Sequence, residues 1–95
     1  MLMKLGVDIS RLKRPVRRIL SRIDAIYTQH GEEAVITSTY EGNHSPSSLH
    51  YDDNAIDFRR PQRFREIVSE IKDAIGNDYD VILEGTHIHI EYDPE

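Results

Sequence analysis

Polar and apolar residues alternate strictly in the C-terminal segment HIHIEY, residues 87–92. An alternation with a period of two residues is typical of a strand that has one buried face. It places His87, His89 and Glu91 on one face of the strand. The isoleucines between them turn to the other face, toward a core.

Three more segments are strand candidates, at residues 34–39, 55–58 and 80–84. Gly85 separates the last of these from HIHIEY and predicts a tight hairpin turn. If Glu84 and Gly85 are the two turn residues, Leu83 pairs with Thr86. The parity of the strands then puts Glu84 on the side of the histidines.

Two segments carry apolar residues at helical spacing. Pro15 suits the first turn of a helix and Gly31 its C-terminal cap, so we expect a first helix at about residues 15–30. Its apolar stripe is Val16, Ile19, Leu20, Ile23, Ile26 and Tyr27. A second helix is expected to begin at Pro61 and to end at Gly76-Asn77, with an apolar face made by Phe64, Ile67, Val68, Ile71 and Ile75.

These elements predict one α+β domain over residues 1–95, with two helices against a small antiparallel sheet. The chain has no cysteine, so a disulfide framework and a thiolate metal site are both excluded. Any metal must be held by His, Asp and Glu. No apolar run approaches the roughly 20 residues of a membrane span, and the N-terminus lacks the apolar segment of an export signal, so we expect no signal peptide and no membrane insertion.

Charge is distributed unevenly along the chain. The first thirty residues hold seven Lys/Arg against two Asp, and the remainder holds five against fifteen Asp/Glu. The basic segment RLKRPVRR, residues 11–18, is compatible with contact to nucleic acid. The apolar stripe of the first helix favours the simpler interpretation, with the arginines on a solvated face and no nucleic-acid partner.

The segment SLHYDDNAIDF, residues 48–58, joins a long polar loop to a strand that carries Asp57. A carboxylate at a buried strand end without a partner costs several kcal/mol, so Asp57 is expected to hold a cation. A catalytic zinc takes three protein ligands at about 2.0–2.2 Å and keeps a fourth position open. His50, Asp57 and one histidine of HIHIEY supply such a set if the two strands are neighbours. His30, at the end of the first helix, is expected to have no metal role.

The combination of SLHYDDNAID with HIHIE resembles the Ser-x-His-x-x-Gly-x-Ala-x-Asp and C-terminal His motifs of the LAS zinc peptidases. That family includes D-Ala-D-Ala carboxypeptidases, dipeptidases and phage L-alanyl-D-glutamate endolysins, and the same residues resemble the zinc site of hedgehog domains. The resemblance covers about residues 34–92 and implies a hedgehog/DD-peptidase-like fold. Asp53 stands where the family has glycine, and the upstream segment TSTYEGN lacks the arginine that many of its peptidases carry.

The resemblance implies a zinc ion bound by His50, Asp57 and His89, with Glu84 as the general base and His87 beside the reacting carbonyl. The spacing Glu84-x-x-His87 also fits the family and would make His87 the third ligand. Ser48 is expected to orient His50 or to stabilise its turn. The implied activity is hydrolysis of a peptide bond in bacterial peptidoglycan, by a carboxypeptidase or an endopeptidase made in the cytoplasm of a phage-infected bacterium and acting on the cell wall.

Two other hypotheses remain open at this stage. In the first, the zinc site serves partner recognition in a non-catalytic module of hedgehog type. In the second, the domain holds no metal, His50 caps a turn, and Asp57 pairs with Arg59 or Arg60. The position of Glu84 relative to the metal ligands separates an enzyme from a binding module.

Overall fold

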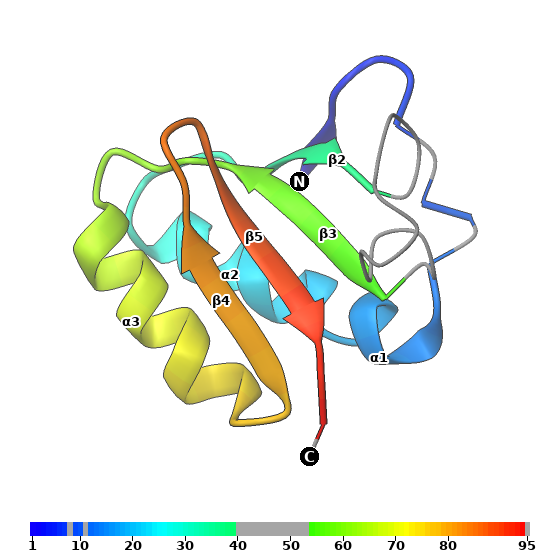
Figure 1. The fold of residues 1–95 in the computed structure, drawn as a ribbon. Coiled ribbons are helices and arrows are strands. Elements are labelled where there is room, and N and C mark those ends of the chain that lie inside the picture. The colour runs from blue at the N-terminus through cyan, green and yellow to red at the C-terminus, as the bar shows by residue number, and fades with distance from the viewer. Residues whose placement is uncertain (8, 11, 40–53, 95) are drawn as a thin grey trace.

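The computed structural model describes residues 1–7, 9–10, 12–39 and 54–94. These residues form an α+β domain in which helices cover one face of a five-stranded sheet (Figure 1). The strands are β1 (Leu2–Met3), β2 (Val35–Ser38), β3 (Ala55–Arg59), β4 (Tyr79–Leu83) and β5 (His87–Tyr92). The helices are α1 (Arg14–Arg17), α2 (Leu20–Gln29) and α3 (Phe64–Ile75). The expected α+β class is confirmed.

The strand order in the sheet is β1-β2-β3-β5-β4. The pairs β2–β3, β3–β5 and β5–β4 are antiparallel, whereas β1 pairs with β2 in parallel. The prediction of a purely antiparallel sheet is therefore wrong at this edge. Strand β1 is only two residues long and exposed, so it lacks the alternating pattern by which the other strands are recognised.

The hairpin between β4 and β5 has a register that differs from the expected one by two residues. Leu83 lies opposite Ile88 instead of Thr86, and the Glu84 amide donates a 2.8 Å hydrogen bond to the His87 carbonyl. Gly85 and Thr86 are therefore the turn residues. A shift of two residues preserves the side-chain alternation, so Glu84 still lies on the histidine side of the sheet.

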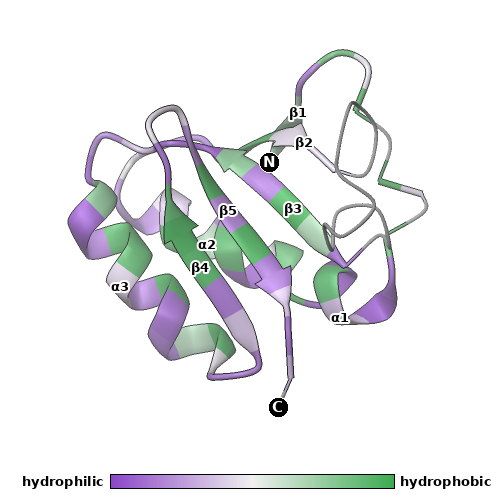
Figure 2. Ribbon diagram, viewed as in Figure 1, coloured by the Kyte–Doolittle hydropathy of each residue, from purple (hydrophilic) through white to green (hydrophobic). Residues whose placement is uncertain are grey.

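The core lies between the sheet and the helices, and the alternation along β3 and β5 is visible as bands of opposite hydropathy (Figure 2). Ile56, Phe58, Ile88 and Ile90 are fully buried on the helix-facing side of these two strands. The helices contribute Val16, Ile23, Ile26, Tyr27, Ile67 and Ile71 to the same core, and the turn between α1 and α2 contributes Ile19. Packing on one face leaves the other face of β3 and β5 for Asp57 and the histidines.

The first helical segment is interrupted, which corrects the expectation of one helix over residues 15–30. Helix α1 ends at Arg17, and the amide of Ile19 bonds the Val16 carbonyl at 3.3 Å in a tightened turn before α2 begins. Both Val16 and Ile19 are buried. The apolar stripe is therefore confirmed, although its backbone changes direction within it.

Several arginines of the basic N-terminal part bind within the domain. Arg17 Nε donates to the Leu12 carbonyl at 3.0 Å, Arg18 Nε to the Tyr79 hydroxyl at 3.1 Å, and Arg22 Nη1 to the Ala74 carbonyl at 2.7 Å. These contacts connect the helical segments to the rest of the fold. No helix in the described ranges is long and apolar enough to cross a membrane.

Helix α3 begins at Phe64, three residues after Pro61, where the sequence predicted its start. An acidic side chain from another segment binds the backbone just ahead of this helix. The amides of Gln62 and Arg63 donate to the Glu32 carboxylate at 2.7 and 2.9 Å. The helix ends at Gly76, whose φ of 83° lies in the left-handed region that glycine adopts readily. The expected end is confirmed.

Candidate functional site

The candidate site lies on the face of the sheet opposite the helices, where β3 and β5 run side by side. Asp57 is directly opposite His89, and Arg59 is directly opposite His87. Directly opposed residues on neighbouring strands share a face and bring their side chains close together. The register thus joins the two segments from which the sequence predicts metal ligands.

Asp57 and the histidines of β5 contact one another. Nδ1 of His89 lies 2.8 Å from Oδ1 of Asp57. Nε2 of His87 lies 3.7 Å from the other oxygen, Oδ2. The ring of His87 is oriented from its far side by Thr86, whose hydroxyl lies 3.0 Å from Nδ1. One carboxylate therefore faces two imidazole rings.

Glu91 completes the contacts of His89. Its carboxylate oxygen Oε1 is hydrogen-bonded to Nε2 of His89. Residues two apart on a strand point to the same side, so Glu91 reaches the ring from its own strand. His89 is consequently held between two carboxylates, one on each ring nitrogen.

The environment of His89 favours its charged form. Burial by itself would lower the pKa of His89, but hydrogen bonds and Coulomb attraction from Asp57 and Glu91 outweigh it, and the pKa is raised above the usual 6.5. The side chains of His89 and Asp57 are 13% and 11% exposed, against 31% for His87. His87 is therefore the more accessible of the two histidines.

The predicted general base, Glu84, follows β4 on the histidine side of the sheet, and its side chain is exposed. Its backbone carbonyl accepts a 3.1 Å hydrogen bond from Nη1 of Arg60. Within the part of the chain that the structure describes, its carboxylate has no hydrogen bond or ion pair with Asp57, His87 or His89. Glu84 therefore lies on the same face of the sheet as the histidines but, among the described residues, takes no part in their contacts with Asp57.

The alternative in which Asp57 pairs with Arg60 does not hold. The guanidinium of Arg60 lies over the Phe64 ring, 4.3 Å from its centroid, in addition to its bond with the Glu84 carbonyl. Arg59 is exposed and makes no ion pair with Asp57 among the described residues. The cationic partners of Asp57 that the structure describes are imidazoles.

The predicted ligand His50 and its neighbours Ser48 and Asp53 lie outside the described residues. His30, which we expected to have no metal role, caps the C-terminus of α2 and bonds the Glu70 carboxylate of α3. This contact is remote in sequence from the Asp57–His89 pair and joins two helices. It gives His30 a structural partner.

The described residues supply part of the predicted zinc site. No three His, Asp or Glu side chains among them converge on a common point suited to a metal. Asp57 and His89 do supply two donors of the type that zinc prefers. Tetrahedral coordination at about 2.0–2.1 Å separates two donors by about 3.4 Å, so an ion between them requires their 2.8 Å contact to open by about half an ångström.

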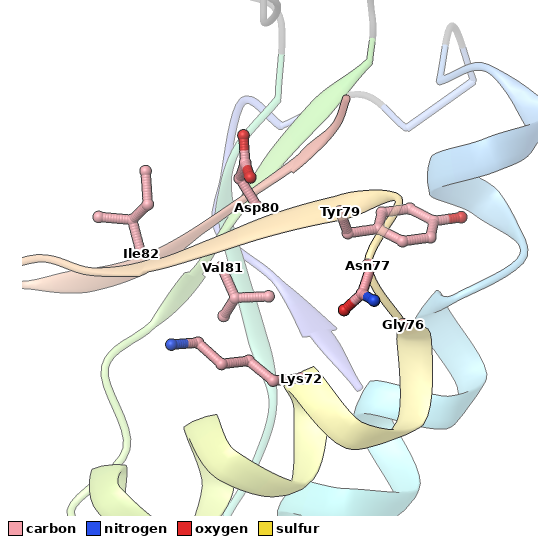
Figure 3. A pocket seen from close by; sticks show the side chains of 7 residues that line it. All are labelled: Lys72, Gly76, Asn77, Tyr79, Asp80, Val81 and Ile82. Atoms are coloured by element: carbon pink, nitrogen blue, oxygen red, sulfur yellow. The ribbon is translucent and has the colours of Figure 1, made fainter. Parts of the chain in front are cut away.

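A separate hollow of about 350 Å³ follows the outer edge of β4 near the C-terminus of α3 (Figure 3). Val81 points from the strand toward α3 and Lys72, while Asp80 and Ile82 point to the opposite side. Lys72 and Asp80 are the charged residues of its lining. The hollow includes none of the histidines, so we place the candidate site at the Asp57–His89 pair.

Glu91 was expected on the histidine face, but no role was predicted for it. The signal was its position two residues after His89 in HIHIEY, which on a strand brings the two side chains together. Thr86 was likewise missed as a partner of His87, because the turn was expected one residue earlier. Both residues act on the orientation of a histidine ring.

Comparisons with known proteins add no relative from which a function can be transferred. No family model, no curated protein and no solved structure matches this chain. The functional hypothesis therefore rests on the motif residues and on the contacts of Asp57 and His89.

Proposed function

We propose that this protein is a zinc-dependent peptidase that hydrolyses peptide bonds in bacterial peptidoglycan, with a hedgehog/DD-peptidase-like fold. The observation that carries the proposal is the 2.8 Å contact between Asp57 and His89. These two residues come from the two motifs that resemble the LAS zinc peptidases, and the sheet register brings them side by side. A chance resemblance in two separate segments would not require them to meet.

In this proposal the zinc ligands are His50, Asp57 and His89. His89 is preferred to His87 because its ring nitrogen is closer to the Asp57 carboxylate, at 2.8 Å against 3.7 Å. The smaller exposure of His89 also suits a ligand, and the greater exposure of His87 suits a residue that meets substrate. Zinc content of the two histidine variants decides between them.

Zinc bound at such a site acts as a Lewis acid on the scissile carbonyl and makes water a competent nucleophile near neutral pH. Glu84 takes the proton of the attacking water and passes it to the leaving amine. Its exposed carboxylate, on the histidine side of the sheet, is accessible to solvent water. His87 donates a hydrogen bond to the oxygen on which negative charge develops, while Thr86 holds its ring.

The proposed substrate is a stem peptide or cross-link of peptidoglycan, and the proposed setting is phage lysis or entry. Both follow from the resemblance to phage endolysins and D-Ala-D-Ala carboxypeptidases. The protein would be made in the cytoplasm of the infected bacterium and act on its wall. No nucleic-acid partner and no membrane insertion are part of the proposal.

The direct test is digestion of purified peptidoglycan by the zinc-loaded protein, with the released fragments identified by mass. Cleavage at one defined peptide bond, lost on chelation and restored by zinc, is the expected result. The fragment masses also separate a carboxypeptidase, which releases a terminal residue, from an endopeptidase, which opens a cross-link. Zinc binding without release of any fragment would contradict the peptidase proposal.

A second candidate function is a zinc-binding module that recognises a partner without catalysis. The observation in its favour is the position of Glu84, whose carboxylate makes no contact with the histidines or Asp57 among the described residues. A site lacking a placed general base can still bind zinc. The digestion experiment separates the two functions, because zinc content and fragment release are measured on the same sample.

A further inference from the structure

His89 has a carboxylate on each ring nitrogen, and only one nitrogen of an imidazole can bind a metal while the other keeps its proton. Asp57 faces Nδ1 and Glu91 faces Nε2. Metal-binding histidines usually donate their remaining N–H to a carboxylate or a carbonyl, which sets the tautomer and aims the ring. One of the two carboxylates is therefore placed to bind the metal together with His89. The other is placed to accept the hydrogen bond from the ring N–H that remains.

The arrangement on the two sides of the ring distinguishes them. On the Nδ1 side, the Asp57 carboxylate that contacts His89 also faces Nε2 of His87, at 3.7 Å through its other oxygen. On the Nε2 side, Glu91 contacts the ring from the same strand. Asp57 is also the more buried of the two acids, with 11% of its side chain exposed against 23% for Glu91.

We propose that Glu91 is a positioning residue that keeps a proton on Nε2 of His89 and thereby leaves Nδ1 as the metal-binding nitrogen. The inference rests on the proposed zinc site and deepens it. Glu91 does not touch the metal or the substrate. It acts through His89, by accepting the Nε2–H hydrogen bond from the far side of the ring.

Zinc affinity measured by competition with a chelator tests this role. Glu91→Ala removes the acceptor and should lower zinc affinity by about 10- to 100-fold, the usual effect of losing such a partner. Glu91→Gln retains a carbonyl oxygen that can accept the Nε2–H bond, so it should keep most of the affinity. If Glu91→Gln keeps the zinc affinity, the effect of Glu91 comes from its hydrogen bond to the His89 ring and not from its negative charge.

Asp80→Asn is the matched control. Asp80 lies directly opposite Glu91 on β4, is exposed, and contributes the same charge to the same face of the sheet. The substitution should leave zinc affinity near that of the wild type. If Glu91→Gln and Asp80→Asn both weaken binding as much as Glu91→Ala, the effect of Glu91 is one of charge, and the positioning role is overturned.

Nitrogen-15 NMR of the histidine rings supplies a readout that a merely structural role would not move. In the zinc-loaded wild type we expect a metal-bound Nδ1 and a protonated Nε2 on His89. Metal on Nε2, or unchanged zinc affinity in a folded Glu91→Ala variant, would overturn the proposal while leaving the zinc site intact. A wild type that binds no zinc would instead overturn the proposed function, and this inference with it.

Discussion

Asp57 and His89 are directly opposite one another on β3 and β5, and their side chains meet at 2.8 Å between Oδ1 and Nδ1. The register that pairs them also buries Ile56, Phe58, Ile88 and Ile90 against the helices. A slip of one residue would turn all of these side chains to the wrong face. The hydrophobic core therefore holds the polar pair in place.

The first prediction concerns the ligands themselves. Asp57→Asn and His50→Ala should each abolish stoichiometric zinc binding, because a site left with two strong protein ligands holds the ion far less tightly. Elemental analysis of purified protein measures the zinc content directly. His30→Ala is the control, since His30 bonds Glu70 between two helices and should not affect the metal. About one zinc per chain in both ligand variants would refute the site.

The choice between His87 and His89 gives a second prediction. His89→Ala should remove zinc, and His87→Ala should retain it while lowering hydrolysis, because His87 is assigned to the developing oxyanion. Zinc content and fragment release are measured side by side. The reverse pattern, with zinc lost only from His87→Ala, would make His87 the ligand and His89 the auxiliary group.

The third prediction concerns Glu84. Glu84→Gln keeps the shape of the side chain and removes its basicity, so zinc content and thermal stability should persist while peptidoglycan hydrolysis falls by about 10²- to 10⁴-fold. The measurement is the rate of fragment release at saturating zinc. Wild-type hydrolysis by this variant would show that Glu84 is not the base.

The fourth prediction is a dependence of stability on pH in the metal-free protein. The pKa of His89 is raised in the folded state, so its charged form stabilises the fold fully below the unfolded pKa of about 6.5, and this contribution is lost as pH rises through the folded pKa. Wild type should therefore lose stability relative to His89→Gln as the pH rises above the unfolded pKa of about 6.5. Thermal melts in chelator measure the difference, in which the titrating groups remote from His89 cancel.

Saturating zinc should reverse that trend in the wild type, because metal binding requires a deprotonated ring nitrogen and is favoured at higher pH. Zinc at about 100 times its dissociation constant stabilises the folded state by about 2.7 kcal/mol. A melting temperature that is insensitive to zinc at every pH would contradict metal binding altogether.

The fifth prediction addresses the scaffold. Glu32 accepts the amides of Gln62 and Arg63 ahead of α3, in the manner of a helix N-cap. Glu32→Ala should cost about 0.5–2 kcal/mol, which corresponds to a fall in melting temperature of about 4–8 °C per kcal/mol in a domain of this size. Glu33→Ala, which removes an exposed carboxylate near the N-terminal amine, should have little effect. Equal losses in both variants would contradict the capping role.

The α+β class, four of the five strands and the end of α3 could be predicted from the sequence, because each depends on local periodicity or on one residue type. The alternation in HIHIEY placed His87, His89 and Glu91 on one face, and the structure bears this out. Parity survives even a mistaken hairpin turn, since a register shift of two residues leaves every side chain on its face.

Other features depended on partners distant in the chain. Strand β1 forms because it pairs in parallel with β2. At the start of α3, the backbone amide of Gln62 donates to Glu32, which lies thirty residues earlier in the chain. The break between α1 and α2 occurs inside a continuous apolar stripe whose residues Val16 and Ile19 are both in the core, so the hydrophobic pattern does not reveal it. The hydrophobic pattern of a single segment does not predict contacts of this kind.

For the candidate site, the sequence by itself determined which residue types were available and which faces they occupy. Only the tertiary structure decided that β3 neighbours β5, and therefore that Asp57 faces His89 at 2.8 Å and that Arg60 turns away to Phe64. Strand order is set by how the whole sheet covers its core, which is a property of the assembled chain. The role proposed for Glu91 likewise depends on the folded structure, because it requires contact between its carboxylate and the His89 ring.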